Sequence, residues 1–289
     1  MTNKKIIFFE LNEVPWRIIE AYCQWHPSSR LGRLLSRCSQ FETISEDVVL
    51  SPWVTWPTVH RGVTDTAHRI HHFGQDLSGV DQEYPPVWRI LADHGVKTAV
   101  FGSLHSYPMP EDVEKYAFYM PDTFAAGSEC FPAELSVFQA FNLSMARASM
   151  RNVSERLPWR AALRVLAKLP DLGLKPSTLI DTGTQVLRER IHPWRKVRRR
   201  TYQSVLAFDI FLRHLDRKRP DFATFFTNHV ASSMHRYWAA AFPDDYDVFE
   251  YDQTWVERFR NEIDFTMSKF DRFLDRLVHF VDRNRDYAL

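Results

Sequence analysis

Hydrophobic residues occur in short runs along this chain, and polar residues and turn signals separate the runs. Three continuous apolar runs, at residues 5–10, 97–101 and 222–226, are typical of buried parallel strands. Other segments repeat apolar residues every three or four positions, which predicts helices with one buried face. The longest such stripe comprises Ile263, Met267, Phe270, Leu274 and Leu277. Shorter helices are predicted from Pro15, at 31–35 and at 87–92, the last closed by Gly95.

This alternation of strands and helices predicts an α/β fold with a mainly parallel sheet sandwiched by helices. Residues 43–50 are a further candidate strand, and residues 103–127 have the Pro and turn residues of a long loop. Residues 131–215 are expected to form a mainly helical insertion. A new strand is expected to begin at 287–289, so we interpret residues 1–289 as a single domain that is incomplete at its C-terminal end.

Composition narrows the classes of function. The net charge is +1, so no overall field favours nucleic acid or acidic membranes. A basic cluster at 195–200 is more simply explained as a solvated helix face than as a nucleic-acid footprint. Three separated Cys and a short apolar N-terminal run without a signal peptide predict a cytoplasmic protein with no transmembrane segment. A role beside a membrane that the chain does not enter stays open.

The stretch at 51–74 concentrates hydroxyl, imidazole, Trp and Pro residues. Pro disfavours helix at the preceding residue, so Thr55 is expected in extended or turn backbone, with Pro57 as the first residue of a helix. A hydroxyl there would face backbone N–H groups that can hold phosphate oxygens, which suits a nucleophile. The alternative is that Thr55 is an ordinary helix N-cap.

Three polar groups lie just past predicted apolar strands: Glu10, Asn12 and Glu13; Thr55 with its neighbours; and Asn228, His229 and His235. The carboxyl ends of parallel strands share one edge of a sheet, so these groups are expected to converge on one site. Carboxylate, hydroxyl and imidazole groups suit a divalent cation such as zinc. A single His at a strand end can equally be a structural, hydrogen-bonded residue.

The order of these pieces resembles the alkaline phosphatase superfamily, in its type I phosphodiesterase/nucleotide pyrophosphatase branch. Three short motifs between about residues 5 and 275 carry the resemblance. They are an apolar strand ending in an acidic turn, a Thr-aromatic-Pro motif at 55–57 followed by Gly62 and His68, and a Pro-Asp strand followed by a His-Arg-aromatic segment at 235–237. The resemblance implies an alkaline-phosphatase-like sheet sandwiched by helices and two divalent metals, usually zinc.

The resemblance also implies roles for individual residues. Thr55 becomes the catalytic nucleophile, and Glu10, Asn12, His235 and His229 become the candidate metal ligands. The candidate substrate-binding residues are Asn228, Trp56, His60 and His68. The sequence departs from the family where Glu10 or Asn12 replaces the first Asp, where Ala231 replaces the Asp partner of His235, and where the chain ends before the later Asp-His pair and final His. Weak or absent metal binding is therefore expected.

Two functions compete on this basis. One is a metal-assisted hydrolase or transferase acting on phosphate or sulfate esters of small molecules or glycans, with Thr55 as nucleophile. The other is a catalytically inactive pseudoenzyme of the same fold that binds a phosphorylated or glycan ligand or a protein partner. A nucleic-acid binder using the cluster at 195–200 is a third hypothesis, disfavoured by the neutral overall charge.

Overall fold

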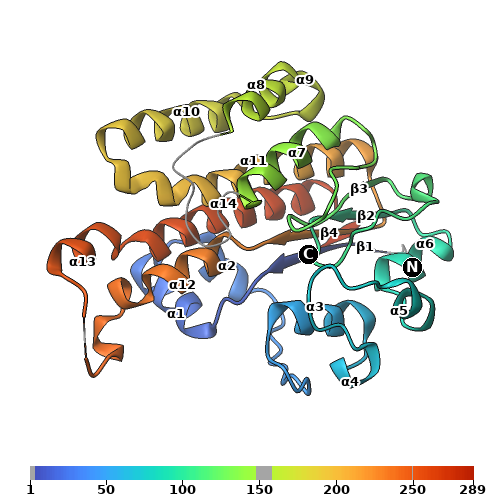
Figure 1. The fold of residues 1–289 in the computed structure, drawn as a ribbon, viewed down its shortest axis with the longest axis horizontal. Helices are drawn as coiled ribbons and strands as arrows, with labels where there is room; N and C mark the ends of the chain where they lie inside the picture. The colour runs from blue at the N-terminus through green and yellow to red at the C-terminus, as the bar shows by residue number, and fades with distance from the viewer. Residues whose placement is uncertain (1–3, 148–157, 249) are drawn as a thin grey trace.

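A five-stranded parallel sheet organises the computed structural model, which describes residues 4–147, 158–248 and 250–289 (Figure 1). Its strands in the order β3-β2-β4-β1-β5 are β3 (Phe118–Met120), β2 (Thr98–Phe101), β4 (Phe222–Thr227), β1 (Lys5–Leu11) and β5 (Tyr287–Ala288). The central strands β1 and β4 pair from Ile6 opposite Phe222 to Leu11 opposite Thr227. The α/β class and the parallel sheet predicted from the apolar runs are confirmed, including the strand at 287–288.

Helices cover both faces of the sheet, and alternate residues of β1 show which helices lie on each face. Ile7 packs in one cluster with residues of α11 (Arg199–Lys218), α7 (Leu135–Arg147) and α14 (Glu262–Arg283). On the same face, Phe9 and Leu11 pack against a second cluster formed by residues of α1 (Trp16–Trp25), α2 (Arg30–Leu35) and α12 (His229–Ala241). On the opposite face, Phe8 packs with α6 (Val87–Asp93). Period-two alternation in the strand therefore places Glu10 on the same face as Phe8.

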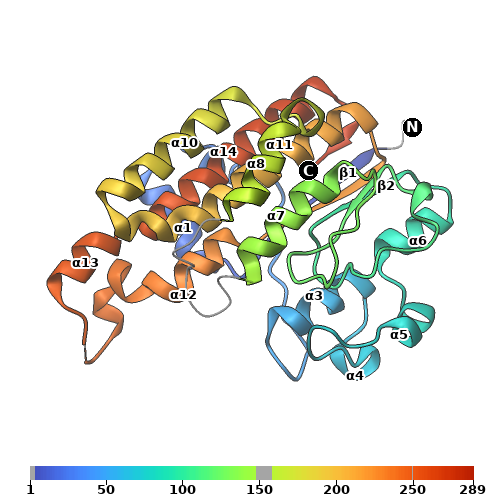
Figure 2. The same cartoon turned by 45° about the horizontal axis from the view of Figure 1, so that its top comes forward.

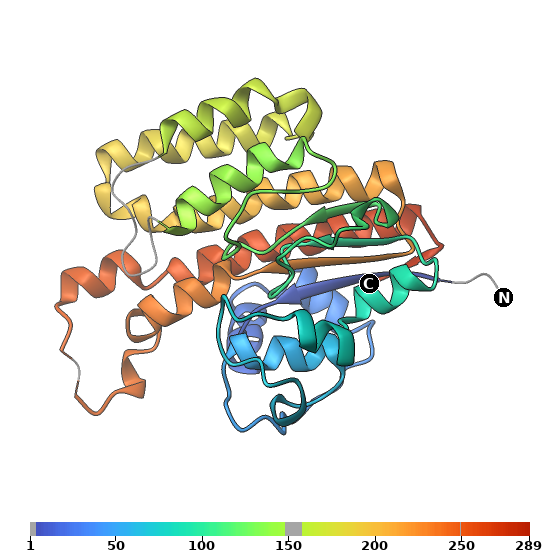
Figure 3. The same ribbon diagram turned by 45° about the vertical axis from the view of Figure 1, so that its right-hand side comes forward.

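The remaining elements of the described chain are short or peripheral. On the α6 side are α3 (Pro52–Arg61), α4 (Asp65–His68), α5 (Ser78–Glu83) and the 3₁₀ turn η1 (Val113–Lys115). Near the end of α12 are η3 (Pro243–Asp245) and α13 (Gln253–Phe259). Figure 3 shows α3, α4 and α5 together on the side of the sheet opposite to the long helices α11 and α14.

The predicted helical character of residues 131–215 is confirmed for the described residues, which exclude 148–157; that this helical insertion is added to a larger domain stays a prediction. It contains α7, α8 (Trp159–Ala167), α9 (Leu169–Leu172), α10 (Pro176–Ile191), η2 (Pro193–Arg198) and most of α11. Figure 2 shows α8 and α10 as an outer layer over α7 and α11. Aromatic packing anchors α11 to the rest of the fold, because the Phe208 ring stacks on the Phe273 ring of α14 at 4.3 Å.

Several local predictions were wrong. Residues 43–50 form no strand, and Ile44, Val48 and Leu50 are exposed, so this apolar segment has no partner strand in the described sheet. Strand β3 occurs inside the segment 103–127 that was predicted as a loop. Helix α3 begins at Pro52, and Pro57 lies inside it, so Thr55 is helical and not extended.

The interpretation of the basic cluster as a solvated helix face was also wrong. Arg198 pairs with the buried Glu262 at 2.7 Å, and Arg199 pairs with the buried Glu189 at 2.7 Å. Each of these arginines can be partly buried because the carboxylate beside it compensates its positive charge. In the described part of the chain, no helix is both long enough and apolar enough to cross a membrane. The three Cys are free thiols.

Candidate functional site

The carboxyl ends of β2 and β4 open onto a cavity of about 470 Å³. One wall is aromatic and includes Phe101, Phe225 and Phe226 from the strands and Trp53 from the first turn of α3. A polar wall comes from α11, from α12 and from the residue that precedes α12. Its members include Asn228, His229, Ser232, His235, Arg236 and Arg200. The cavity therefore joins an apolar surface to a hydrogen-bonding and positively charged one.

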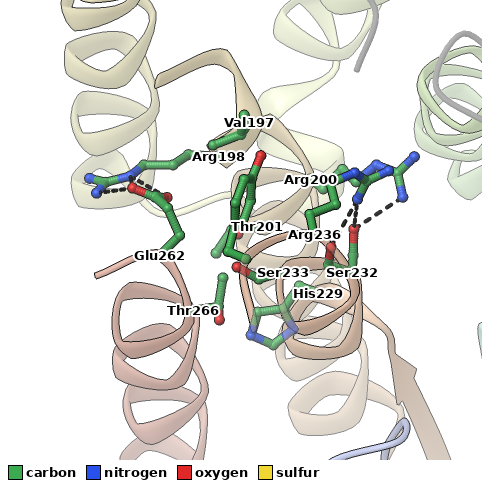
Figure 4. Close-up of a pocket in the computed structure, with 11 residues that line it drawn as sticks. Val197, Arg198, Arg200, Thr201, His229, Ser232, Ser233, Arg236, Glu262 and Thr266 are labelled. Atoms are coloured by element: carbon green, nitrogen blue, oxygen red, sulfur yellow. Dashed lines mark hydrogen bonds and ion pairs between the residues drawn. The ribbon is translucent and has the colours of Figure 1, made fainter. Parts of the chain in front are cut away.

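Two arginines from different helices meet at Ser232 on this polar side. Figure 4 shows them in a close-up of a smaller adjoining pocket, which shares Arg200, His229, Ser232 and Arg236 with the cavity. Arg200 of α11 donates to the Ser232 hydroxyl at 3.1 Å, and Arg236 of α12 donates to the same oxygen at 2.6 Å. Arg236 also donates to the Ser232 carbonyl at 2.9 Å. Burial, and then the nearby positive charge of Arg236, lower the pKa of Arg200 to about 10. Two guanidinium groups that repel each other beside a cavity make an anion there favourable.

Asn12 links the loop after β1 to the start of α12 and to α3. The indole Nε1 of Trp56 donates to Asn12 Oδ1 at 2.6 Å, and Asn12 Nδ2 donates to Asn228 Oδ1 at 2.8 Å. The same Nδ2 donates to Glu13 Oε2 at 2.9 Å, and His235 Nε2 lies 3.0 Å from that carboxylate oxygen. The predicted convergence at one edge of the sheet holds for Asn12, Asn228 and His235, but Glu10 and Thr55 do not line the cavity. The roles of Asn12 and His235 as metal ligands stay a prediction.

Glu10 belongs to a separate, buried polar cluster beneath α3. Its Oε1 lies 3.2 Å from His60 Nε2 and 3.1 Å from Ser103 Oγ, and Ser103 Oγ lies 2.7 Å from Thr224 Oγ1. Two residues of a strand span about 6.6 Å, and four residues of a helix span about 6 Å. Side chains four residues apart on α3 can therefore contact side chains two residues apart along β1 and its continuation. Trp56 thus meets Asn12 while His60 meets Glu10.

The hydroxyl of Thr55 has a local partner within α3. Thr55 Oγ1 donates to the Ser51 carbonyl at 3.1 Å, and Thr55 is not among the residues that line the cavity. The N-terminus of α3 also offers fewer donors than the sequence suggested. Pro52 has no N–H, and the N–H groups of Val54 and Thr55 both donate to the Ser51 carbonyl.

The two predicted His residues outside this network have different surroundings. His68 Nε2 lies 3.0 Å from Thr58 Oγ1, and its Nδ1 accepts from the Ile70 N–H at 2.9 Å, so it supports the corner between α3 and α4. His229 lines the cavity, with Nδ1 2.7 Å from Thr227 Oγ1. Burial lowers the pKa of His229 to about 4, which keeps the imidazole neutral at pH 7.

The four candidate zinc ligands do not form a ready metal centre. Among the described residues, no group of three or more His, Cys, Asp or Glu side chains is placed to hold a metal ion. Glu10 is directed to His60, Asn12 is occupied by Trp56 and Asn228, and the Nδ1 of His229 faces Thr227. Glu10 Oε2 and His229 Nε2 are buried without a hydrogen-bond partner, but in the described chain neither atom belongs to a group of three possible ligands, so we derive no chemical step through a metal.

Comparison with known proteins gives no identification, because no family model, no curated protein and no solved structure matches the chain. Several residues that line the cavity were missed by sequence reasoning, and the ones that matter most for its chemistry are Trp53, Ser232, Arg236 and Arg200. A signal for Arg236 was present, because it directly follows the predicted His235. No sequence signal could separate Arg200 from its basic neighbours, because its burial depends on the packing of α11 against α12.

Proposed function

We propose that this chain binds the phosphate or sulfate group of an ester in the cavity at the carboxyl edge of the sheet. The observation that supports this proposal best is the convergence of Arg200 and Arg236 on the Ser232 hydroxyl at the cavity wall. Guanidinium groups suit tetrahedral oxyanions, because their N–H donors can bind two oxygens at once. The aromatic wall around Trp53 and Phe226 would receive the apolar or ring-bearing part of the ester.

This proposal fits a degenerate, alkaline-phosphatase-like protein of the pseudoenzyme kind. The parallel sheet with helices on both faces and the polar groups at its carboxyl edge support that relationship. The departures at Glu10, Asn12 and Ala231, and the local partner of the Thr55 hydroxyl, favour binding over turnover.

Calorimetric titration tests the binding proposal with inorganic phosphate, inorganic sulfate and the 4-nitrophenyl esters of both. We expect Arg236→Gln and Arg200→Gln each to weaken anion binding by about tenfold or more, since a charged hydrogen bond contributes about 1.5–3 kcal/mol. Arg190→Gln, on the exposed end of α10, is the matched control and should leave affinity unchanged. Equal affinity in all four proteins would remove the cavity from the proposal.

Ester hydrolysis or transfer is the second candidate function. It is favoured by the position of Trp53, which lines the cavity only two residues before Thr55 on the same helix. In that case the Thr55 hydroxyl would leave the Ser51 carbonyl and lose its proton to solvent, and Oγ1 would bond to phosphorus or sulfur as the bond to the ester oxygen breaks and the alcohol leaves. Water would then release the group from Thr55. Release of 4-nitrophenol with added zinc or manganese, compared between the protein and Thr55→Ala, tests this candidate. Equal rates in the two proteins would exclude Thr55 as the nucleophile.

A further inference from the structure

Helix α8 presents an apolar ridge on its outer side. Trp159, Leu163 and Leu166 are 59%, 53% and 49% exposed, although they recur at the spacing that normally buries one helix face. The face of α8 that does pack against the core consists of Val165 with Ala161 and Ala162. The ridge is therefore a second apolar face, which packing within the described chain does not bury.

A basic row lies next to this ridge. Arg160 and Arg164 are exposed, Lys168 follows at the end of the helix beside Asp171, and α8 itself contains no acidic residue. At about 100° per residue, the three apolar positions fall within an arc of about 60°, and Arg160 begins about 60° beyond it. The Arg160 guanidinium lies 5.4 Å from the centre of the Trp159 ring. The outward half of α8 is thus divided into an apolar strip and a cationic strip.

The neighbouring helix α10 also exposes apolar and basic side chains. Ile180, Leu187 and Ile191 of α10 are exposed, and Arg188 and Arg190 are exposed near its end. Figures 1, 2 and 3 all place α8 and α10 in the outer layer of the helical insertion, on the far side of α7 and α11 from the sheet. No segment of the described chain is drawn outside this layer.

We propose that α8, supported by α10, binds the surface of an anionic lipid bilayer. A helix with a large amphipathic moment, Trp and Leu on one strip and Arg beside it, lies in the membrane interface with its apolar strip in the acyl boundary. Trp favours the headgroup level, and each basic residue near an anionic surface strengthens attachment. The whole chain carries a net charge of only +1, so this attraction is local to the insertion.

Charge favours lipid over a second copy of the chain as the occupant. An antiparallel, symmetric pairing of two copies through α8 would bring Arg160 and Arg164 of the two copies to the same side of the interface, where like charges repel. An anionic membrane would place acyl chains against the apolar strip and anionic headgroups beside the cationic strip. Attachment would be peripheral, because no described helix can span a bilayer.

Vesicle co-sedimentation tests the proposal on the full chain, with vesicles of phosphatidylcholine alone and of phosphatidylcholine mixed with phosphatidylserine. We expect binding to the mixed vesicles that weakens with added salt. The double variant Leu163→Ser/Leu166→Ser should bind at least tenfold more weakly, and Arg160→Gln/Arg164→Gln about fivefold more weakly for each arginine removed. Phe41→Ser/Ile44→Ser is the matched control, because it removes two exposed apolar side chains elsewhere. Circular dichroism establishes that each variant is folded.

Three results would overturn the proposal. The first is equal vesicle binding by the folded ridge variant and the unaltered chain. The second is a chain that binds neither kind of vesicle and forms a dimer in light scattering that the ridge variant lacks, since the ridge would then be an interface between copies. The third is an equal loss of binding in the Phe41→Ser/Ile44→Ser control, since the binding would then not be specific to α8.

Discussion

The buried ion pair between Arg198 and Glu262 allows a quantitative test of how the helical insertion is held to the fold. The pair joins the end of η2 to the start of α14. It is bidentate, because Arg198 Nε lies 2.9 Å from Glu262 Oε2 and Arg198 Nη2 lies 2.7 Å from Glu262 Oε1. Glu262 is almost fully buried, and Arg198 also covers the Phe265 ring at 3.9 Å. Glu262→Gln removes the negative charge while keeping the size of the side chain. An uncompensated guanidinium would then remain in a poorly solvated place.

We expect Glu262→Gln to lower the free energy of unfolding by about 3 kcal/mol, the lower part of the range for breaking a buried pair. For a chain of this length, that corresponds to a fall of about 5 °C in Tm, measured by scanning calorimetry. Asp275→Asn is the control, because its pair with Arg30 is partly exposed and should contribute less than about 1 kcal/mol. Replacing both partners, Arg198→Met/Glu262→Met, should recover most of the loss. If Glu262→Gln lowered Tm no more than Asp275→Asn, the reasoning would be refuted.

Three further predictions address packing, the Asn12 network and pH. Phe208→Ala should cost about 3–5 kcal/mol in urea unfolding, because the ring is fully buried among other aromatic rings; a cost below 1 kcal/mol would contradict this. Trp56→Phe keeps a ring but loses the bond to Asn12, and should cost about 1 kcal/mol in the same assay. The pKa of His229 is lowered from 6.5 to about 4, so its stabilising contribution is complete above pH 6.5 and is lost as pH falls toward 4. The difference between Tm at pH 7 and Tm at pH 5 should therefore be smaller in His229→Gln than in the unaltered chain. Burial raises the pKa of Asp122 to about 6, so this carboxyl group favours the folded state as pH falls, and it does so in both proteins.

The positions that could be predicted from sequence were those where local pattern and packing agree. The apolar runs of β1, β2 and β4 became strands because strands covered on both faces need apolar residues at nearly every position. The gathering of Asn12, Asn228 and His235 also followed, since parallel strands must end at a common edge. Thr55 was misplaced because α3 begins earlier than Pro57 suggested. Pro57 lies inside α3 and cannot donate to the Trp53 carbonyl, but His105 Nε2 lies 2.9 Å from that oxygen and can satisfy it.

By itself, the sequence determined the α/β class, the parallel strands, the helical character of residues 131–215 and the polar edge after β1 and β4, because these follow from periodicity along the chain. Only the tertiary structure decided which basic residues are buried and what they face. Arg198, Arg199 and Arg200 are consecutive and chemically identical, yet two of them face glutamates and the third faces the cavity beside Arg236. Successive residues of a helix point about 100° apart, so their surroundings depend on which elements pack around that helix.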